Sequence, residues 1–572
     1  MCGISGIIGP LATKQNISKM TYALWHRGHD AIQYQCKEGN YALGHNRLSI
    51  IDLSEAANQP FQVLGYPYKL VFNGEIYNYI EIRQELQYLG INFQTKSDTE
   101  VLLQAYIKWG ENCLEKFNGM FSFAIYHTDS NKLFIARDRF GVKPLYYYHS
   151  KDTLIFASEI KAIRTLISTK VNQSVLANYL VFGSYGLPNE SFFEHIHQLA
   201  GGHYLTFEYD EIEITRWYDF ISRVNVLKES LKDISKEEAK QTYKQKLEKS
   251  ISLRFRADVP VGFTLSGGVD SSLLLALISQ RKDVSKIKAF TFYTGDERYD
   301  ELPWVEKMVN STLTNLEKVI FEPKHFDKWH KRISKVQDEP YGGLPTLAYA
   351  NLFQAMSNKG VKVVLDGQGM DEAWAGYDYY QNNSTHTIQG QKSNPFKLNV
   401  LNEVILKEAK EPNYPKPFSD ELLDKQYRDL FYTKIPRALR FNDRVSMAAT
   451  TELREPFLDY NLVEYAFSLP KPLKINKGVG KYLLREILSE YSSEVALAPK
   501  RPLQTPQREW LGNELSSTVD RAINQLEKSI YADYFKIDEM KNEWQDYKNG
   551  SQDSSFHLWQ WISVSELINS AC

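Results

Sequence analysis

The stretch "GFTLSGGVDSS" at residues 262–272 constrains the fold more than any other part of this sequence. An apolar run that ends in Ser266, Gly267 and Gly268 is typical of a strand, and a helical pattern begins near Ser271. The later stretches "KIKAFTFYT" and "KVVLDGQGMDE" have the same character of a strand, the second one followed by a polar loop. Strands that alternate with helices in this way predict a doubly wound parallel sheet, with ligands at the carboxyl ends of its strands.

The glycine-rich loop between this strand and helix is predicted to bind an anion. Backbone N–H groups and hydroxyls converge there on the positive end of a helix. The lysine of a Walker loop is missing from the sequence, so backbone dipoles and a metal ion would have to meet phosphate charge. Asp270 is the local candidate to bind that metal. The alternative is a glycine-rich turn that serves only packing.

The N-terminal part of the chain has a different pattern. Up to about residue 210, short strand-like pieces such as "KLFIARD" and "TLIFAS" surround two helical stretches near residues 79–89 and 98–109. This pattern predicts an antiparallel α+β domain. Residues 226–250 are charged and lack glycine and proline, which favours a helical connector. We therefore expect an N-terminal domain at 2–210, a connector at 211–250 and a second domain at 251–572, whose last third is mostly helical.

Composition narrows the classes of function. The 572 residues carry a net charge of -2 without a basic block, which argues against nucleic-acid binding. No apolar run approaches the roughly 18 residues that a membrane-spanning helix needs. The four cysteines are scattered singly, so neither structural disulfides nor a zinc site are expected. A cytoplasmic protein without a membrane partner is the expectation.

Cys2 directly follows the initiator methionine. If Met1 is removed, Cys2 carries both a thiol and a free α-amine with a pKa of about 8, which can act as a base toward its own sulfur. A cysteine at position 2 also occurs by chance, so the motifs that follow decide its meaning. They are "HRG" (26–28), "HNRLSIIDL" (45–53), "FNGEIYNY" (72–79), "SDTEVLL" (97–103), "FNGMFSFAIY" (117–126) and "RDRFGVKPLYY" (137–147).

In this order the motifs resemble the glutamine amidotransferases of the N-terminal-nucleophile type (class II), and the S-G-G-x-D-S loop resembles the PP-loop ATP pyrophosphatases. Together they resemble the glutamine-hydrolysing asparagine synthetase family over nearly the whole chain. The resemblance implies an αββα sandwich fused to a PP-loop domain. It further implies that glutamine gives ammonia at Cys2, that ATP with Mg²⁺ adenylates aspartate, and that ammonia then gives asparagine, AMP and pyrophosphate. The family also leads us to expect a homodimer.

The resemblance assigns a role to each residue of a glutamine site. Cys2 would attack the amide, Asn73 and Gly74 would form the oxyanion hole, and Arg47 would bind the α-carboxylate. Each assignment has a structural alternative: an ion pair for Arg47, a hairpin turn for "NGE" and a helix N-cap for Asp98. His26 and Arg27 are expected to brace the fold. The full glutamine-binding set is Arg47, Leu48, Ile50, Asn73, Gly74, Glu75 and Asp98.

The resemblance assigns a second set of residues to the ATP-dependent reaction. Asp270 and Asp371 are the expected Mg²⁺ ligands, and Lys481 is the expected pyrophosphate-binding lysine, with a helix-surface lysine as its alternative. The expected ATP-binding residues are Leu265, Ser266, Gly267, Gly268, Asp270, Ser271, Ser272, Phe292, Asp366 and Gly367. The expected synthetase site consists of Gln368, Asp371, Glu372 and Lys481.

One departure from the family pattern bears on the acceptor. "DGQGMDE" (366–372) stands where the family has S-G-E-G-x-D-E, so Asp366 replaces a serine and Gln368 replaces a glutamate. A glutamine side chain can neither accept a proton as a base nor bind a cation by charge. Either another carboxylate takes that role, with Glu372, Asp338 and Glu339 as the candidates, or the acceptor differs from aspartate. A uronic acid in surface-polysaccharide assembly is the alternative acceptor.

Two further alternatives concern the whole protein. A catalytically inactive relative could bind glutamine or a nucleotide as a sensor, but the intact Cys2, Arg47, Asn73 and S-G-G-x-D-S loop argue against it. A plain amidase would not need the second domain. Because ammonia in water is largely protonated, it has to reach the second site without contact with bulk water, which gives a physical reason for the fusion.

Overall fold

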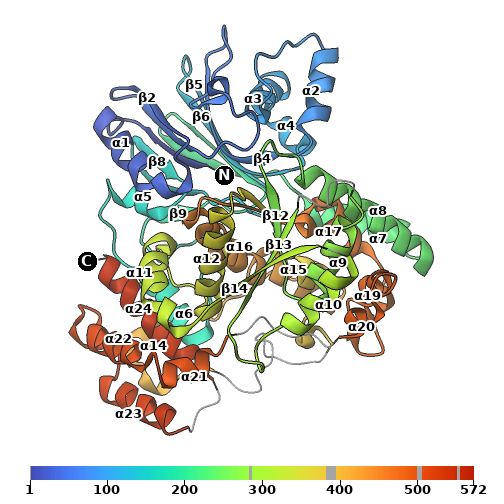
Figure 1. Cartoon of the computed structure of the whole chain (residues 1–572). Coiled ribbons are helices and arrows are strands. Elements are labelled where there is room, and N and C mark those ends of the chain that lie inside the picture. Colours follow the sequence, from blue (N-terminus) through green and yellow to red (C-terminus); the bar gives the residue numbers. More distant parts are fainter. Residues whose placement is uncertain are drawn as a thin grey trace.

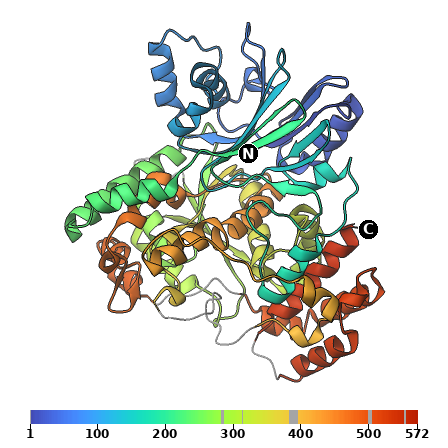
Figure 2. The ribbon, with the colours of Figure 1, turned by 180° about the vertical axis from the view of Figure 1, so that it is seen from behind.

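The computed structural model describes residues 2–281, 287–312, 314–381, 395–498, 505–550 and 554–571. Figure 1 shows two stacked halves, with the blue to teal N-terminal strands above and the green to red remainder below. The N-terminal end of the chain lies between the two halves, and Figure 2 shows the same position from behind. Cys2 is accordingly buried at the boundary of the halves.

The first sheet of the upper half has six antiparallel strands in the order β2-β3-β1-β8-β7-β9. Its central strand β1 is buried on both faces. Ile7 packs toward helices α1 (Lys14–Ala23) and α5 (Ile160–Arg164), whereas Ile4 and Ile8 pack toward the second sheet. The strands are β1 (Gly3–Ile8), β2 (Ala31–Lys37), β3 (Tyr41–Arg47), β7 (Tyr146–Ser150), β8 (Thr153–Ala157) and β9 (Ile196–Gln198).

The second sheet has five antiparallel strands in the order β11-β10-β6-β5-β4. Helices α2 (Tyr79–Tyr88), α3 (Asp98–Trp109) and α4 (Cys113–Lys116) cover its outer face through a shared apolar core. The four layers are helix, sheet, sheet and helix, so the predicted αββα sandwich is confirmed. The strands are β4 (Tyr68–Ile76), β5 (Gly119–His127), β6 (Lys132–Arg137), β10 (His203–Glu208) and β11 (Glu211–Arg216).

Helices α7 (Phe220–Ser230) and α8 (Lys236–Arg254) lead into the lower half, which contains a five-stranded sheet in the order β14-β13-β12-β15-β16. All neighbouring strands of this sheet are parallel, and helices cover both faces, as the sequence predicts for a doubly wound sheet. The strands are β12 (Val261–Thr264), β13 (Lys288–Tyr293), β14 (Asn315–Ile320), β15 (Val363–Leu365) and β16 (Glu452–Arg454). The helices are α9 (Val269–Ile278) and α10 (Leu302–Thr312) on one face, and α11 (Phe326–Gln337) and α12 (Gly343–Asn358) on the other.

The strand order of this sheet reverses between β12 and β15. In doubly wound sheets the carboxyl ends of the strands at such a reversal form a crevice for ligands. The loop after β12 is the glycine-rich loop of the sequence analysis, and the loop after β15 contains "DGQGMDE". The fold therefore brings the two predicted nucleotide-binding motifs to one crevice.

The rest of the chain is mostly helical, as predicted. Figure 1 shows the red C-terminal helices packed below the parallel sheet, with α6 (Gln173–Phe182) of the N-terminal part among them. The amide of Gln560 in α24 donates to the Tyr179 carbonyl oxygen in α6 at 2.6 Å. The longer helices are α15 (Glu421–Phe431), α16 (Lys434–Ala448), α17 (Tyr460–Ser468), α19 (Tyr482–Ser489), α22 (Ser516–Lys528), α23 (Ile537–Lys548) and α24 (Phe556–Ala571).

One hydrophobic core extends through both halves. It contains Ile7 of β1 and Leu176 of α6 together with Val445 of α16 and Trp561 of α24. The two halves are therefore packed against each other through apolar side chains as well as through ion pairs. Among the described helices, none is long and apolar enough to cross a membrane.

The turn after β1 allows a test of the packing inside the upper half, where it contacts the turn between β7 and β8. Gly9 has a φ of +106°, and a Cβ atom there would lie 2.1 Å from the carbonyl oxygen of Asp152. Gly65 also has a positive φ, of +85°, but a Cβ atom there would meet nothing within 4 Å. We expect Gly9→Ala to unfold about 2 °C lower than Gly65→Ala, because backbone overlap adds roughly 2 kcal/mol to the shared strain and a chain of 572 residues unfolds with a large entropy. Circular dichroism during heating measures both midpoints, and equal midpoints would contradict this packing.

Candidate active sites

Cys2 immediately precedes the central strand β1 and is buried. Its backbone N–H donates to Asn73 Oδ1 at 3.0 Å, and its Sγ lies 3.9 Å from the carbonyl oxygen of Leu48. Burial raises the pKa of the Cys2 thiol. The thiol is therefore protonated at neutral pH in this surrounding, and a base is needed to make it a nucleophile.

Asn73 and Gly74 lie side by side in β4, opposite Ser122 and Phe121 of β5. Asn73 is fully buried, and its Nδ2 has no hydrogen-bond partner among the residues that the structure describes. Gly74 has a φ of +145°, and a Cβ atom there would lie 2.0 Å from the carbonyl oxygen of Met120. Only glycine fits this backbone. Beside Cys2 the structure thus places a buried amide donor with unused hydrogen-bonding capacity.

Arg47 ends β3 and is 6% exposed. Its guanidinium donates to the carbonyl oxygens of Ser54, at 2.7 Å, and Asp52, and to Asn58 Oδ1 at 2.8 Å. No carboxylate of the described residues lies within ion-pairing distance, so the ion pair considered for Arg47 is absent there. These bonds engage three of the five N–H groups of the guanidinium and leave two for an anionic ligand.

Two buried carboxyl groups face each other near this pocket. Asp98 begins α3, and its Oδ2 accepts a hydrogen bond from the Ile76 N–H at 3.0 Å, while Ser97 is the actual N-cap of the helix. Burial raises the pKa of Asp98 to about 6. Burial, with Glu452 and Asp98 nearby, raises the pKa of Glu75 well above its ordinary value. A ligand with a positive charge would restore the ionised form of both groups.

The lower half also contributes to this region. Arg454 of β16 lies with Nη2 3.5 Å from Glu75 Oε1, and its Nε donates to Glu452 Oε1 at 2.5 Å. Arg27, which the sequence analysis expected to brace the fold, donates through Nε to the carbonyl oxygen of Cys2 at 2.9 Å. Sequence reasoning missed Glu452 and Arg454, because only the tertiary packing of the two halves brings β16 to β4.

The second site is a large cavity at the carboxyl ends of β12 and β15, with a volume of about 1770 Å³. Gly267 has a φ of +71° in the loop that forms one wall, where the Ser266 N–H donates to Ser271 Oγ at 3.1 Å. Ser272 and Glu372 are fully buried and are not among the lining residues. The predicted residues that line it are Leu265, Ser266, Gly267, Gly268, Asp270, Ser271, Phe292, Asp366, Gly367, Gln368, Asp371 and Lys481.

Lys481 joins the two predicted metal ligands. Its Nζ lies 2.5 Å from Asp270 Oδ1 and 2.6 Å from Asp371 Oδ1, and the residue is 5% exposed. Burial alone would lower the pKa of Lys481, but the two carboxylates raise it. Gly376 has to be glycine, since a Cβ atom there would lie 1.9 Å from Asp371 Oδ1. Lys481 is therefore part of the cavity wall and not a helix-surface lysine.

The donor set in this wall fits a magnesium ion bound together with phosphates. Asp270 and Asp371 bring two negative charges against the one positive charge of Lys481, and all their donors are oxygens. Within the described ranges, no group of three or more His, Cys, Asp or Glu side chains is arranged to hold a metal ion. Two carboxylates suffice where a nucleotide supplies the remaining oxygen ligands.

The three candidate replacements for the missing glutamate lie in different places. Asp338 and Glu339 lie at the contact with the upper half, where Asp338 Oδ2 is 3.1 Å from Lys161 Nζ and Glu339 Oε2 is 3.0 Å from Arg440 Nη1. Glu372 instead accepts a hydrogen bond at 2.7 Å from the hydroxyl of Tyr377, which lines the cavity. Burial and the neighbouring Asp371 raise the pKa of Glu372 to about 7. Glu372 and Glu339 thus each bond to a residue that lines the cavity, since Arg440 lines it as well. Glu372 is the one of the two that lies within the "DGQGMDE" loop.

The chain combines a buried cysteine beside an amide donor in an αββα sandwich with a glycine-rich loop in a doubly wound sheet. This combination defines a class of two-site proteins with an N-terminal-nucleophile domain. Comparison with known families agrees: "Glutamine amidotransferase domain" matches residues 1–218 and "Asparagine synthase" matches residues 242–569. The chain belongs to the asparagine synthase family.

Individual relatives are similar over most of their length. "Asparagine synthetase [glutamine-hydrolyzing] 3" of Bacillus subtilis is 30% identical over 85% of this chain and 84% of its own. "Putative asparagine synthetase [glutamine-hydrolyzing] 2" of Methanocaldococcus jannaschii is 35% identical over 66% of this chain and 76% of its own. "Amidase chyE" of Penicillium rubens is 26% identical over 91% of each chain. Similar chains therefore carry more than one functional name.

Proposed function

We propose that this protein is a ligase that uses ATP and glutamine to convert a carboxylate into an amide, with aspartate as the first acceptor to test. Glutamine is hydrolysed at Cys2, and the ammonia is used at the cavity of the lower half. The observation that carries the proposal is the buried pair of Cys2 and Asn73, in which one amide atom holds the Cys2 backbone and the other is unpartnered among the described residues.

The glutaminase step begins when Met1 is removed and the Cys2 α-amine becomes a base. The amine takes the thiol proton, and Sγ forms a bond to the carboxamide carbon of glutamine. The oxygen that gains negative charge is stabilised by Asn73 Nδ2 and the Gly74 N–H. Ammonia leaves with the transferred proton, and water hydrolyses the thioester to glutamate.

The pocket residues supply one partner for each charged end of glutamine. The two remaining N–H groups of Arg47 bind the α-carboxylate. Asp98 and Glu75 hold the α-ammonium, which also relieves the unfavourable burial of their own charge. Glutamine is thereby recognised by charge at both ends and by its amide at Cys2.

The synthetase step takes place in the large cavity. The loop at 265–271 holds the phosphates of ATP through backbone N–H groups and hydroxyls. Asp270 and Asp371 would hold Mg²⁺, which reduces the negative charge on the phosphates. An oxygen of the acceptor carboxylate attacks the α-phosphorus and pyrophosphate leaves toward Lys481. Ammonia then attacks the acyl carbon, AMP leaves, and Glu372 takes the released proton through Tyr377.

Replacing the nucleophile tests the first step. Cys2→Ala should lower glutamate release from glutamine by about a thousandfold or more, because no thioester can form. The same variant should still form the amide from ammonium salts, since the second site is intact. Cys36→Ala, which removes a half-buried cysteine in β2, is the control and should match the wild type. Glutamate release that survives in Cys2→Ala would overturn the assignment.

The charge of Asp98 predicts a pH dependence. Its pKa of about 6 means that it becomes neutral as the pH falls below 6, and a neutral carboxyl attracts the glutamine ammonium less. Glu452 and Arg454 face the same carboxyl, one raising and one lowering its pKa. The KM for glutamine should rise up to about tenfold per pH unit below pH 6, separately from the fall in kcat that protonation of the Cys2 α-amine causes. Asp98→Asn should have a high KM at every pH. A pH dependence of KM that persists in this variant would mean that another group causes it.

A second acceptor deserves a test because Gln368 lines the cavity where the family has a glutamate. Release of pyrophosphate from ATP should be measured with aspartate and with a panel of other carboxylic acids, uronic acids included. We expect a signal with aspartate, and a signal with a sugar acid alone would replace aspartate as the acceptor.

The role of Gln368 is measured on the same panel. If Gln368 selects the acceptor, Gln368→Glu should change the ratio of kcat/KM values between two acids by about tenfold, whichever acid the wild type prefers. An unchanged ratio would show that other residues of the cavity select the acceptor.

A further inference from the structure

We propose that Asp443 of α16, in the lower half, is a positioning residue for the Cys2 nucleophile of the upper half, and that it acts through the guanidinium of Arg27. The inference rests on the proposed glutaminase reaction. It goes beyond that reaction, since it makes the second half of the chain a part of the first site.

The geometry around Arg27 carries the inference. Arg27 is fully buried, and its Nη1 and Nη2 donate to the two oxygens of Asp443 at 2.9 and 3.4 Å. Its Nε donates to the carbonyl oxygen of Cys2 at 2.9 Å. Because a guanidinium is planar and rigid, the two bonds to Asp443 fix its orientation, and that orientation aims Nε at Cys2.

Glu159 cannot supply this orientation alone. Its Oε1 accepts a hydrogen bond from Arg27 Nη1 at 2.6 Å. This contact engages only one of the two terminal nitrogens of Arg27, so the guanidinium could still rotate about it. Glu159 also bonds to His26 at 3.1 Å and to Lys161. Its charge is therefore shared with other groups, whereas Asp443 binds both terminal nitrogens of Arg27.

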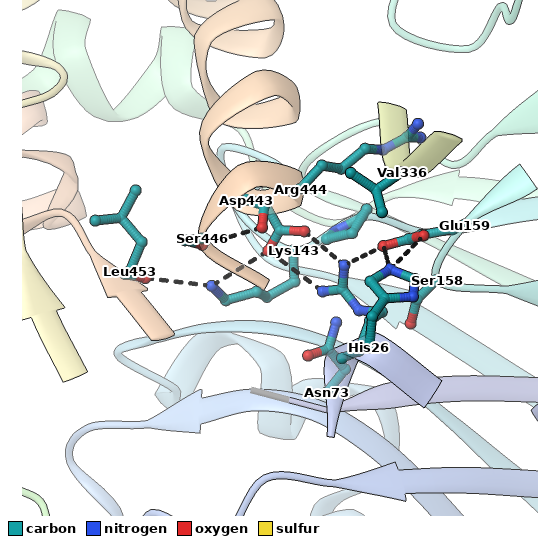
Figure 3. Close-up of polar contacts among 12 residues, drawn as sticks. His26, Asn73, Lys143, Ser158, Glu159, Val336, Asp443, Arg444, Ser446 and Leu453 are labelled. Carbon is teal, nitrogen blue, oxygen red and sulfur yellow. Dashed lines mark hydrogen bonds and ion pairs between the residues drawn. The ribbon is translucent and has the colours of Figure 1, made fainter. Parts of the chain in front are cut away.

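Asp443 is held by its helix in the lower half and by a cation, Lys143, of the upper half. Figure 3 shows it on helix α16, five residues before the helix ends at Ala448, with Lys143 and Leu453 on one side and Glu159 and His26 on the other. Lys143 Nζ lies 3.9 Å from Asp443 Oδ1 and donates to the Leu453 carbonyl oxygen at 3.4 Å. The next residue, Arg444, donates to the Tyr146 hydroxyl at 2.9 Å. The carboxylate thus has a fixed place from which to orient Arg27.

The same helix reaches the synthetase cavity. Arg440, Phe441 and Asn442 line that cavity, and Asn442 directly precedes Asp443. One turn of α16 therefore contacts the acceptor-side cavity and, through Arg27, the backbone of the nucleophile. The residue next to a wall residue of the second site thus completes the first site.

The test uses the processed full-length protein with Asp443→Asn. We expect kcat for glutamine hydrolysis to fall about tenfold with KM nearly unchanged, because the nucleophile is misplaced while Arg47 and Asp98 still bind glutamine. Amide formation from ammonium salts should persist, which also reports that the variant folds. Glu159 still neutralises Arg27 in this variant, so the buried guanidinium keeps a charged partner.

The matched control is Asp459→Asn. Asp459 is a buried carboxylate that also joins the two halves, with bonds to Arg254 at 3.1 Å and to Asn118 at 2.8 Å, but it does not contact Arg27. It should leave kcat for glutamine hydrolysis within about twofold of the wild type. A tenfold fall in this control would mean that any lost carboxylate between the halves has the same effect, and would overturn the specific role of Asp443.

A double-variant cycle separates positioning from a general structural role. In an Arg27→Gln background, Asp443→Asn should have no further effect on kcat, since its action passes through Arg27. Additive effects, or a parallel loss of the ammonia-dependent activity, would overturn the proposal. A wild-type protein that releases no glutamate would instead refute the proposed function. Alkylation of Cys2 by iodoacetamide then still tests the positioning role. Its rate should change in Asp443→Asn and not in Asp459→Asn, because only the first variant removes a bond that orients Arg27 toward Cys2, and equal rates would overturn the proposal.

Discussion

The positive charge of Arg27, which is buried out of contact with solvent, constrains how the two halves pack against each other. A buried guanidinium is tolerated only when carboxylates neutralise it with good geometry. One of these, Glu159, comes from the upper half and the other, Asp443, from the lower half. Two further cations extend the contacts across the boundary: Lys143 of the upper half faces Asp443, and Arg444 of the lower half donates to the Tyr146 hydroxyl. The relative position of the halves is thus fixed by charge as well as by apolar packing.

This boundary is also where the two sites approach each other. Cys2 starts the central strand of the sandwich at the boundary, and β16 of the parallel sheet reaches it with Arg454, which faces Glu75. In the proposed reaction, the ammonia released at Cys2 starts inside the protein, since Cys2 is buried. An enclosed start keeps it from being protonated by bulk water before it meets an acyl group. The fusion of the two halves therefore has a chemical purpose beyond keeping two activities on one chain.

Local patterns were sufficient to predict much of the fold. Strand-like pieces, helical periods and the glycine-rich turn indicate an antiparallel α+β half with helices at 79–89 and 98–109, and a parallel sheet with its loop. The αββα layering of the N-terminal half was an expectation from the family resemblance. The motifs also identified residues that lie together in the structure, including Asp270, Asp371 and Lys481 in one cavity wall. The pairing of Arg27 with Asp443 could not be predicted, because 416 residues separate them and only the packing of α16 joins them. The partners of Asp338 and Glu339 could not be predicted either. Their motif suggested a chemical role, but in the structure they pair with the cations Lys161 and Arg440 at the contact between the halves.

The core that runs from Ile7 through Val445 to Trp561 has a consequence for how such proteins diversify. A chain whose halves were joined only by a flexible linker could exchange one half for that of another protein and keep both folds. Here an exchanged lower half would bring apolar side chains that fit a different surface, and it would lack the Asp443 carboxylate that pairs with Arg27. Recombination at the connector is therefore a poor route to a new acceptor. Change by substitution within the cavity, as at Gln368, leaves the shared core untouched and is the route that this architecture permits.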